Sequence, residues 1–361
     1  MDEVLQATCF INGPQIKDLE ATLAAFVGVK HCIACDNGTS AIHMVLRAMD
    51  IGPGDEVITV PFTWISTVEA IVLAGATPVL VDVEAHSFNM NVSQVKAAIT
   101  PKTKAIMPVS LFGQCADMAA LAELSEESGI PIIEDAAQSF GATQGGKASG
   151  SLSRIATTSF FPAKPLGCFG DGGAVFTDDD ELATNCVAIR NHGAVVRDTH
   201  TRLGFTGRLD SLQAAVLNVK MKHFPSAVEA RGRIGARYSE LLSGTAATPP
   251  QVVPGNTHVY AQYTVRVSNR DAVVAGLKAR GIPCGVYYPT GCHLQPVFAE
   301  YGWAEGDFPV TEALGKEVLS LPMHPYLTED VQDHVVQCLK EAMEEAAAEA
   351  PASAAAATAQ G

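Results

Sequence analysis

Short apolar runs alternate with amphipathic helical patterns between about residues 57 and 137. The runs are continuous rather than alternating, which is typical of strands that are covered on both faces. Strands are predicted over 57–60, 78–83, 105–110 and 131–134, with helices over 67–75, 92–99 and 118–129. This order predicts βαβ units around a buried, mostly parallel sheet.

Two more strands are predicted over 157–161 and 174–177, too close together for an ordinary helical crossover. A helical stretch from 212 to about 242 leads into a Pro- and Gly-rich connection, TAATPPQVVPGN. Beyond it, a strand over 259–267, a helix over 271–281 and a strand over 284–289 are expected. We therefore predict a large domain over 1–240, a smaller C-terminal α+β domain over 241–345 and a disordered Ala-rich tail over 346–361.

Polar or aromatic residues follow several of the predicted strands. Trp64 follows the first, Gln114 the third, Asp135 and Gln138 the fourth, and Lys164 the fifth. Ligands of open α/β sheets bind beyond the carboxyl ends of the strands. We therefore expect these side chains to meet at one edge of the sheet.

Lys164 and Asp135 are the residues of this set best suited to chemistry. Lys164 lies in FFPAKPLGCFGDGG, an apolar and glycine-rich setting in which desolvation would lower the pKa of an amine and favour a Schiff base with a carbonyl cofactor. A lysine that snorkels from a turn fits equally well. Asp135 could hold a pyridoxal ring nitrogen, although an N-cap is the commoner use of such an aspartate.

The segment Asn37-Gly38-Thr39-Ser40 precedes a helical pattern and could form a phosphate cradle, with Ser159 adding a hydroxyl. Ordinary helix capping is the more frequent role. Trp64 could stack on a planar ring, although core packing is commoner for a single Trp. The run GCFGDGG does not match GxGxxG, so a nicotinamide dehydrogenase is not favoured.

Composition narrows the functional classes. There are 24 Lys and Arg against 39 Asp and Glu, a net charge of −15, which disfavours nucleic acid as a partner. The nine cysteines suggest reduced thiols, and the CxxC of Cys32 and Cys35 is best explained by small buried residues. No apolar stretch of membrane-spanning length or secretory signal is recognisable, and no metal site is expected, so a cytoplasmic protein is predicted.

Several blocks together resemble the DegT/DnrJ/EryC1/StrS family of pyridoxal 5'-phosphate (PLP) sugar aminotransferases. They include NGTSAIHMVLRAMDIGPGDEVITVPFTWISTVEAI, IPIIEDAAQSFGA, TSFFPAKPLGCFGDGGAVFTDD and GRLDSLQAAVL, and the resemblance runs from about residue 10 to 339. It implies the fold-type I transferase architecture, a mostly parallel seven-stranded sheet flanked by helices. Within the family, the chain is most similar to members that aminate UDP-2-acetamido-2-deoxy-3-oxo-glucuronate for surface polysaccharide synthesis, with glutamate as donor. The resemblance also implies a homodimer with shared active sites.

The resemblance implies a role for each matching residue. Lys164 would be the Schiff-base lysine, Asp135 the partner of the pyridine nitrogen, Gln138 a contact near the ring hydroxyl, and Trp64 the stacking residue. The phosphate would be held by Gly38, Thr39, Ser40, Ser159 and, across the dimer, Thr206. The substrate would be contacted by Arg208 of the neighbouring subunit and by Tyr287, Tyr288 and His293.

Two positions depart from the family pattern, with Thr206 in place of Asn and Tyr287 in place of His. Relatives also carry an extra segment before the match, and its absence is expected to weaken the dimer or open the site. Three alternatives stay open: another UDP- or dTDP-keto sugar as substrate, a catalytically impaired regulatory relative, and a sugar dehydratase. Dehydratases of this family carry His at the Schiff-base position, so Lys164 disfavours that alternative.

Overall fold

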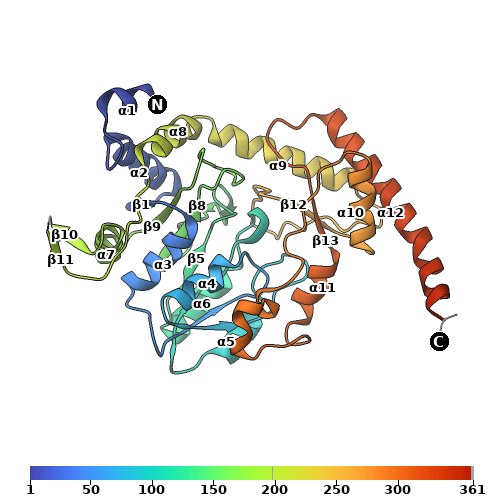
Figure 1. The fold of residues 1–361 in the computed structure, drawn as a ribbon, viewed down its shortest axis with the longest axis horizontal. Helices are drawn as coiled ribbons and strands as arrows, with labels where there is room; N and C mark the ends of the chain where they lie inside the picture. The colour runs from blue at the N-terminus through green and yellow to red at the C-terminus, as the bar shows by residue number, and fades with distance from the viewer. Residues whose placement is uncertain (197, 359–361) are drawn as a thin grey trace.

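The computed structural model describes residues 1–196 and 198–358, with side chains described through residue 348. Among these residues the central sheet has seven strands. Figure 1 shows the whole fold, with helices arranged around this sheet. Its spatial order is β3 (Thr77–Leu80), β2 (Glu56–Thr59), β4 (Thr103–Ile106), β5 (Ile133–Asp135), β8 (Ile155–Ser159), β9 (Gly173–Thr177) and β1 (His31–Cys35). Two parallel bridges, Ile106 to Ile132 and Val109 to Asp135, join β4 to β5. The predicted mostly parallel seven-stranded sheet is confirmed.

Strand β9 is antiparallel to both of its neighbours, β8 and β1. The connection from β8 to β9 is short, which accounts for the missing helical crossover. Strand β1 contains Cys32 and Cys35, and both side chains are buried, as the sequence predicted. The nine cysteines are all free in the structure.

Helices cover both faces of the sheet, because successive strand residues alternate between two apolar layers. On one face, Val57, Ile133 and Ile155 pack against α3 (Gly38–Ala48), α4 (Ser66–Leu73) and α7 (Asp180–Arg190). On the other face, Ile58 and Ile106 pack against α5 (Val92–Ala98) and α6 (Met118–Ser128). That same face continues under α2 (Pro14–Val27) and α8 (Ser211–Met221).

A second apolar core lies around the antiparallel pair β12 (Tyr263–Arg266) and β13 (Val318–Leu321). It is covered by α9 (Phe224–Leu241), α10 (Arg270–Ala279) and α12 (Glu329–Thr358). The remaining elements are α1 (Asp2–Ala7), α11 (Pro309–Glu317), the short helices η1 (Leu111–Gly113), η2 (Cys292–Leu294) and η3 (Pro296–Tyr301), and the pairs β6 (Thr143–Gln144) with β7 (Lys147–Ala148) and β10 (Ala194–Val196) with β11 (Thr199–His200).

Two predicted elements differ from the observed ones. The single helix over 212–242 is two helices, because α8 ends at Met221 and Pro225 lies in the first turn of α9. The strand over 284–289 is wrong. This segment makes only a bridge between Gly285 and Ser320, and the prolines at its two ends cannot donate ladder hydrogen bonds.

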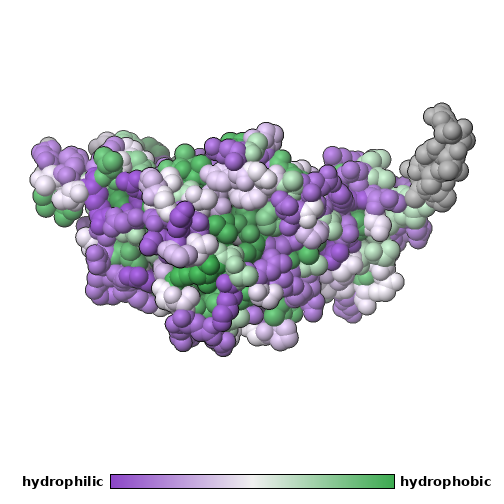
Figure 2. All heavy atoms as spheres, turned by 90° about the horizontal axis from the view of Figure 1, so that it is seen from below, coloured by the Kyte–Doolittle hydropathy of each residue, from purple (hydrophilic) through white to green (hydrophobic). Residues whose placement is uncertain are grey.

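The C-terminal segment was predicted to be disordered over 346–361. Helix α12 continues through this segment as far as Thr358, in keeping with the high helix propensity of alanine, and residues 359–361 lie outside the described residues. In the part that the structure describes, no helix combines the length and hydropathy needed to cross a bilayer. On the face shown in Figure 2, apolar side chains gather towards the middle and hydrophilic ones towards the two sides.

Candidate active site

Asp135 is the last residue of β5, and its side chain is buried. Thr67 Oγ1 donates to Asp135 Oδ2 at 2.9 Å, and the Ala137 backbone N–H donates to Asp135 Oδ1 at 3.1 Å. Burial raises the pKa of the Asp135 carboxyl, while these hydrogen bonds and the charge of Lys164 act against that rise. The two hydrogen bonds thus fix the orientation of the carboxyl, and burial makes it a stronger base than an exposed aspartate.

Lys164 lies in the loop after β8, where its backbone N–H donates to the Phe161 carbonyl at 2.8 Å. Desolvation lowers the pKa of its ammonium group, and attraction to Asp135 opposes that shift. Each group perturbs the pKa of the other, so the amine and the carboxyl face the same region. The two groups thus lie near enough for their charges to act on each other, and their joint role at a cofactor stays a prediction.

The loop that carries Lys164 is held tightly from one side. A Cβ on Gly167 would lie 2.5 Å from the Pro162 carbonyl oxygen, so this position has room for glycine alone. Helix α8 supplies two anchors, because Lys220 Nζ donates to the Gly167 carbonyl and Gln213 Oε1 accepts from Phe169 N at 2.8 Å. The glycine-rich run is thus a means of fixing Lys164.

One amide and two aromatic side chains, those of Gln138, Tyr288 and Trp64, form a connected group near Asp135. Gln138 is buried, with its Oε1 accepting from Phe112 N at 2.9 Å and its Nε2 donating to Tyr288 OH at 3.2 Å. The Trp64 ring lies 6.0 Å from the Tyr288 ring, and 57% of Trp64 is exposed. This exposure argues against core packing for Trp64 and leaves its ring free to receive a planar ligand.

The N-terminus of α3 gathers the predicted phosphate ligands. Asn37 caps the helix by accepting from Ser40 N at 2.8 Å, and Thr39 Oγ1 shares a 2.8 Å hydrogen bond with Ser66 Oγ. A Cβ on Gly38 would lie 2.9 Å from the Ser159 Cβ, so Ser159 is in direct contact with this turn. Backbone N–H groups, hydroxyls and the helix dipole together suit a phosphate group.

Arg208 lies close to this turn within its own chain, since it forms an antiparallel bridge with Cys35. Its Nε is buried without a hydrogen-bond partner, as is Asp36 Oδ1. Thr206 is exposed, and its Oγ1 shares a 2.7 Å hydrogen bond with His192 Nε2. The roles of Thr206 and Arg208 across a dimer stay predictions.

The predicted substrate residues are split between two environments. Tyr287 is partly exposed, with its ring 6.0 Å from that of Tyr288. His293 is buried, and its Nε2 lies 3.1 Å from Glu312 Oε1. Tyr288 thus stands beside Trp64, and Tyr287 beside Tyr288. His293 lies in the interior of its loop, and the contacts of all three residues with substrate stay predictions.

The prediction that Gln114 reaches the site is wrong. Its Nε2 donates to the Gln251 carbonyl at 3.0 Å and its Oε1 accepts from Val253 N at 2.6 Å, so its amide is taken up by the connection 245–256. Conversely, the sequence analysis gave no role to Thr67 or Ser66, which bond the predicted site residues Asp135 and Thr39. The hydroxyl-rich start of α4 just after Trp64 was the signal that could have found them.

These groups fit PLP on chemical grounds. A buried carboxyl suits a ring nitrogen, a desolvated amine suits an aldehyde, an open indole suits a flat ring, and the capped start of α3 suits a phosphate. Among the described residues, no cluster of three or more His, Cys, Asp or Glu side chains could hold a metal ion.

Together, the sheet and this donor set define a fold-type I, PLP-dependent aminotransferase. The chain belongs to the DegT/DnrJ/EryC1/StrS aminotransferase family, whose model matches residues 1–340. It is 49% identical to a UDP-2-acetamido-2-deoxy-3-oxo-D-glucuronate aminotransferase of Pseudomonas aeruginosa, over 91% of this chain and 90% of that one. It is 48% identical to a pleiotropic regulatory protein of Geobacillus stearothermophilus, over 94% and 92% of the two chains. The crystal structure of S. venezuelae DesV in complex with a ketimine intermediate matches with a TM-score of 0.92 and 39% identity, over 94% and 92%.

Proposed function

We propose that this enzyme transfers the amino group of L-glutamate to a nucleotide-linked keto sugar, UDP-2-acetamido-2-deoxy-3-oxo-glucuronate, for surface polysaccharide synthesis. The observation that carries the proposal is the desolvated Lys164 amine coupled to the buried Asp135 carboxyl beside Trp64 and Tyr288. The similarity to the P. aeruginosa aminotransferase supports the choice of sugar.

We propose a set of contacts for each part of the cofactor. Asp135 would hold the ring nitrogen, Gln138 would contact the ring near its hydroxyl, Trp64 would cover one face, and Gly38, Thr39, Ser40 and Ser159 would hold the phosphate. When bound, PLP supplies an aldehyde that accepts amines and a ring that withdraws electrons from the adjoining carbon.

Lys164 is the residue proposed to move protons. Because desolvation lowers the pKa of its ammonium group, more of the amine is neutral near neutral pH than for an ordinary lysine. A neutral amine can take a proton from the donor's Cα and return it to the reacting carbon, acting first as base and then as acid. The negative charge of an Asp135 carboxylate beside the ring nitrogen would favour the protonated form of that nitrogen.

We also propose a cytoplasmic homodimer. Phe161 and Phe169, in the segment that carries Lys164, are 51% and 73% exposed, and Leu203, near Thr206, is 81% exposed. Such large apolar side chains on the surface are typical of an interface between protein chains. Light scattering should give twice the mass of one chain, whereas a single-chain mass would contradict the dimer.

The experiment that tests the function is a turnover assay with glutamate and a panel of UDP- and dTDP-linked keto sugars, with 2-oxoglutarate as the measured product. We expect the fastest turnover with the 3-oxo-glucuronate and none with Lys164→Ala. Preference for another keto sugar would replace the substrate but keep the reaction. Absence of 2-oxoglutarate with every sugar would refute the proposed activity.

A second candidate, a regulatory role, is favoured by the 48% identity to the G. stearothermophilus protein. The turnover assay separates the two, because a regulator without transaminase activity would bind the cofactor and still form no 2-oxoglutarate. The retained Lys164, Asp135 and Gln138 favour the enzyme.

A further inference from the structure

A buried carboxylate outside the cofactor site joins the large sheet to α11. Asp82 lies just beyond β3 and is 3% exposed. Its Oδ2 accepts from Val310 N at 2.8 Å, and its Oδ1 accepts from Thr311 N at 3.0 Å and Thr311 Oγ1 at 2.7 Å. Val83 N also donates to Oδ1, at 2.8 Å. Asp82 thus satisfies the free N–H groups at the start of α11 from a distant part of the chain.

Helix α11 in turn supports the segment that carries Tyr288. A Cβ on Gly315 would lie 2.8 Å from the Pro289 carbonyl oxygen, so the helix packs directly on this segment. The segment 288–293 has a second contact with α11, because Glu312 Oε1 lies 3.1 Å from His293 Nε2. A shift of α11 would therefore move Tyr288, whose hydroxyl accepts from Gln138.

The same segment also supports Trp64. Cys292 N donates to the Pro61 carbonyl at 2.8 Å, and Cys292 Sγ lies 3.6 Å from the Thr63 carbonyl oxygen. These bonds fasten the backbone immediately before Trp64 to the segment that rests on α11. Both Tyr288 and the backbone before Trp64 are thus linked through this segment to α11, whose first turn is bonded to Asp82.

We propose that Asp82 is a positioning residue, which fixes α11 and through it sets Tyr288 and Trp64 against the cofactor and the keto sugar. Asp82 makes no contact with Lys164, Asp135 or Gln138 among the contacts described, so it acts only through other residues. The expected change in kinetics rests on the proposed function. The expected change in how the cofactor is held does not depend on which sugar is the substrate.

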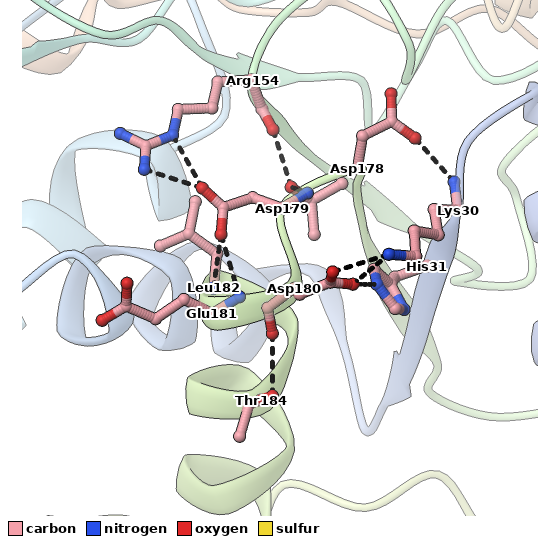
Figure 3. Close-up of polar contacts among 10 residues, drawn as sticks. Lys30, His31, Arg154, Asp178, Asp179, Asp180, Glu181, Leu182 and Thr184 are labelled. Atoms are coloured by element: carbon pink, nitrogen blue, oxygen red, sulfur yellow. Dashed lines mark hydrogen bonds and ion pairs between the residues drawn. The ribbon is translucent and has the colours of Figure 1, made fainter.

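The test compares Asp82→Ala with Asp179→Ala. Asp179 caps α7 by accepting from Glu181 N and Leu182 N, both at 3.0 Å (Figure 3). It follows the last residue of β9, at the end of the sheet away from the candidate site. Both variants lose a helix cap, but only Asp82→Ala should disturb the ring site. We measure kcat and KM for the keto sugar, and the circular dichroism of the bound cofactor, which reports how the ring is held.

We expect Asp82→Ala to reduce kcat/KM by about tenfold or more, with a raised KM and a changed cofactor dichroism, because small displacements of positioning groups are costly. Asp179→Ala should leave these quantities at wild-type values. Asp82→Asn keeps the Oδ1 acceptor for Thr311 but replaces the Oδ2 acceptor of Val310 N with a donor, so it should recover part of the loss. Wild-type kinetics and dichroism in Asp82→Ala would overturn the proposal.

A second variant keeps the test decisive if Asp82→Ala does not fold. Thr311→Val removes a single hydrogen bond to Asp82 while retaining the shape of the side chain. It should shift the cofactor dichroism in the same direction as Asp82→Ala, by a smaller amount, and an unchanged spectrum would contradict the inference. If the wild type binds cofactor but transfers no amino group, the proposed function fails, whereas the dichroism still decides the role of Asp82.

Discussion

At the carboxyl edge of the sheet, burial raises the pKa of the Asp135 carboxyl, whereas at the opposite edge the pKa values of Asp179 and Asp180 are held below the usual range. Figure 3 shows why the second edge differs, since the Arg154 guanidinium donates to Asp179, and Lys30 and His31 contact Asp180. Strand β9 connects the two edges, with its first residue at the site and its last beside Arg154.

The carboxyl ends of the parallel strands and the opposite strand ends thus have different roles in the protein. Asp179 caps α7 and pairs with Arg154, so its charge is neutralised by groups that only hold the fold together. Asp135 receives two neutral donors and the distant attraction of a desolvated lysine. Buried groups with strongly shifted pKa values and no full ion-pair partner are typical of functional sites.

The largest effect should come from Lys164→Ala. Removal of the amine eliminates both the covalent attachment of the cofactor and the proposed acid and base, so transamination should fall by roughly 10³-fold or more. Stopped-flow or steady-state formation of 2-oxoglutarate measures the loss, and thermal unfolding checks that the variant is folded. Turnover within a few fold of wild type would contradict the role of Lys164.

Asp135→Asn should have the next largest effect, with activity reduced by about 10²-fold, because a neutral amide cannot hold a proton on the ring nitrogen. The charge of Asp135 also raises the pKa of Lys164, so its removal should lower that pKa further. The acid limb of the pH profile of kcat/KM should therefore move to lower pH. An unmoved limb would show that the two groups are not coupled.

Asp179→Ala should affect stability alone, by about 1 kcal/mol at neutral pH, through loss of the helix cap. The hydrogen bonds from Arg154 lower the folded-state pKa of Asp179, so its contribution is complete above the ordinary aspartate pKa of about 4 and is lost as the pH falls further. Denaturant unfolding at neutral and acid pH should show a difference that shrinks in acid. Reduced turnover in this variant would show that the two edges are not independent.

Continuous apolar runs predicted the parallel strands well, because a strand covered on both faces needs apolar side chains on both. The prediction over 284–289 was wrong because an apolar run says nothing of whether a neighbouring strand is available. There Pro289 packs on α11 instead, and Gly285 makes a single bridge.

The site was predictable only in part for a similar reason. Lys164 and Asp135 stand out by their apolar surroundings in sequence, and the structure couples them. The bonds from Thr67 to Asp135 and from Gln138 to Tyr288 join residues far apart in the chain. The hydroxyls at the start of α4 could suggest that Thr67 has a role, but no local pattern identifies the partner of either residue. Gln114 follows a strand as they do, but its amide bonds the connection at Val253.

The most direct test of the central claim is to reduce the holoenzyme with borohydride and locate the cofactor by peptide mass spectrometry. Reduction makes the bond between the cofactor and its lysine permanent. We predict a phosphopyridoxyl group on Lys164, in the peptide that follows β8, and an unmodified peptide in Lys164→Ala. Attachment to any other lysine, or to none, would contradict the account.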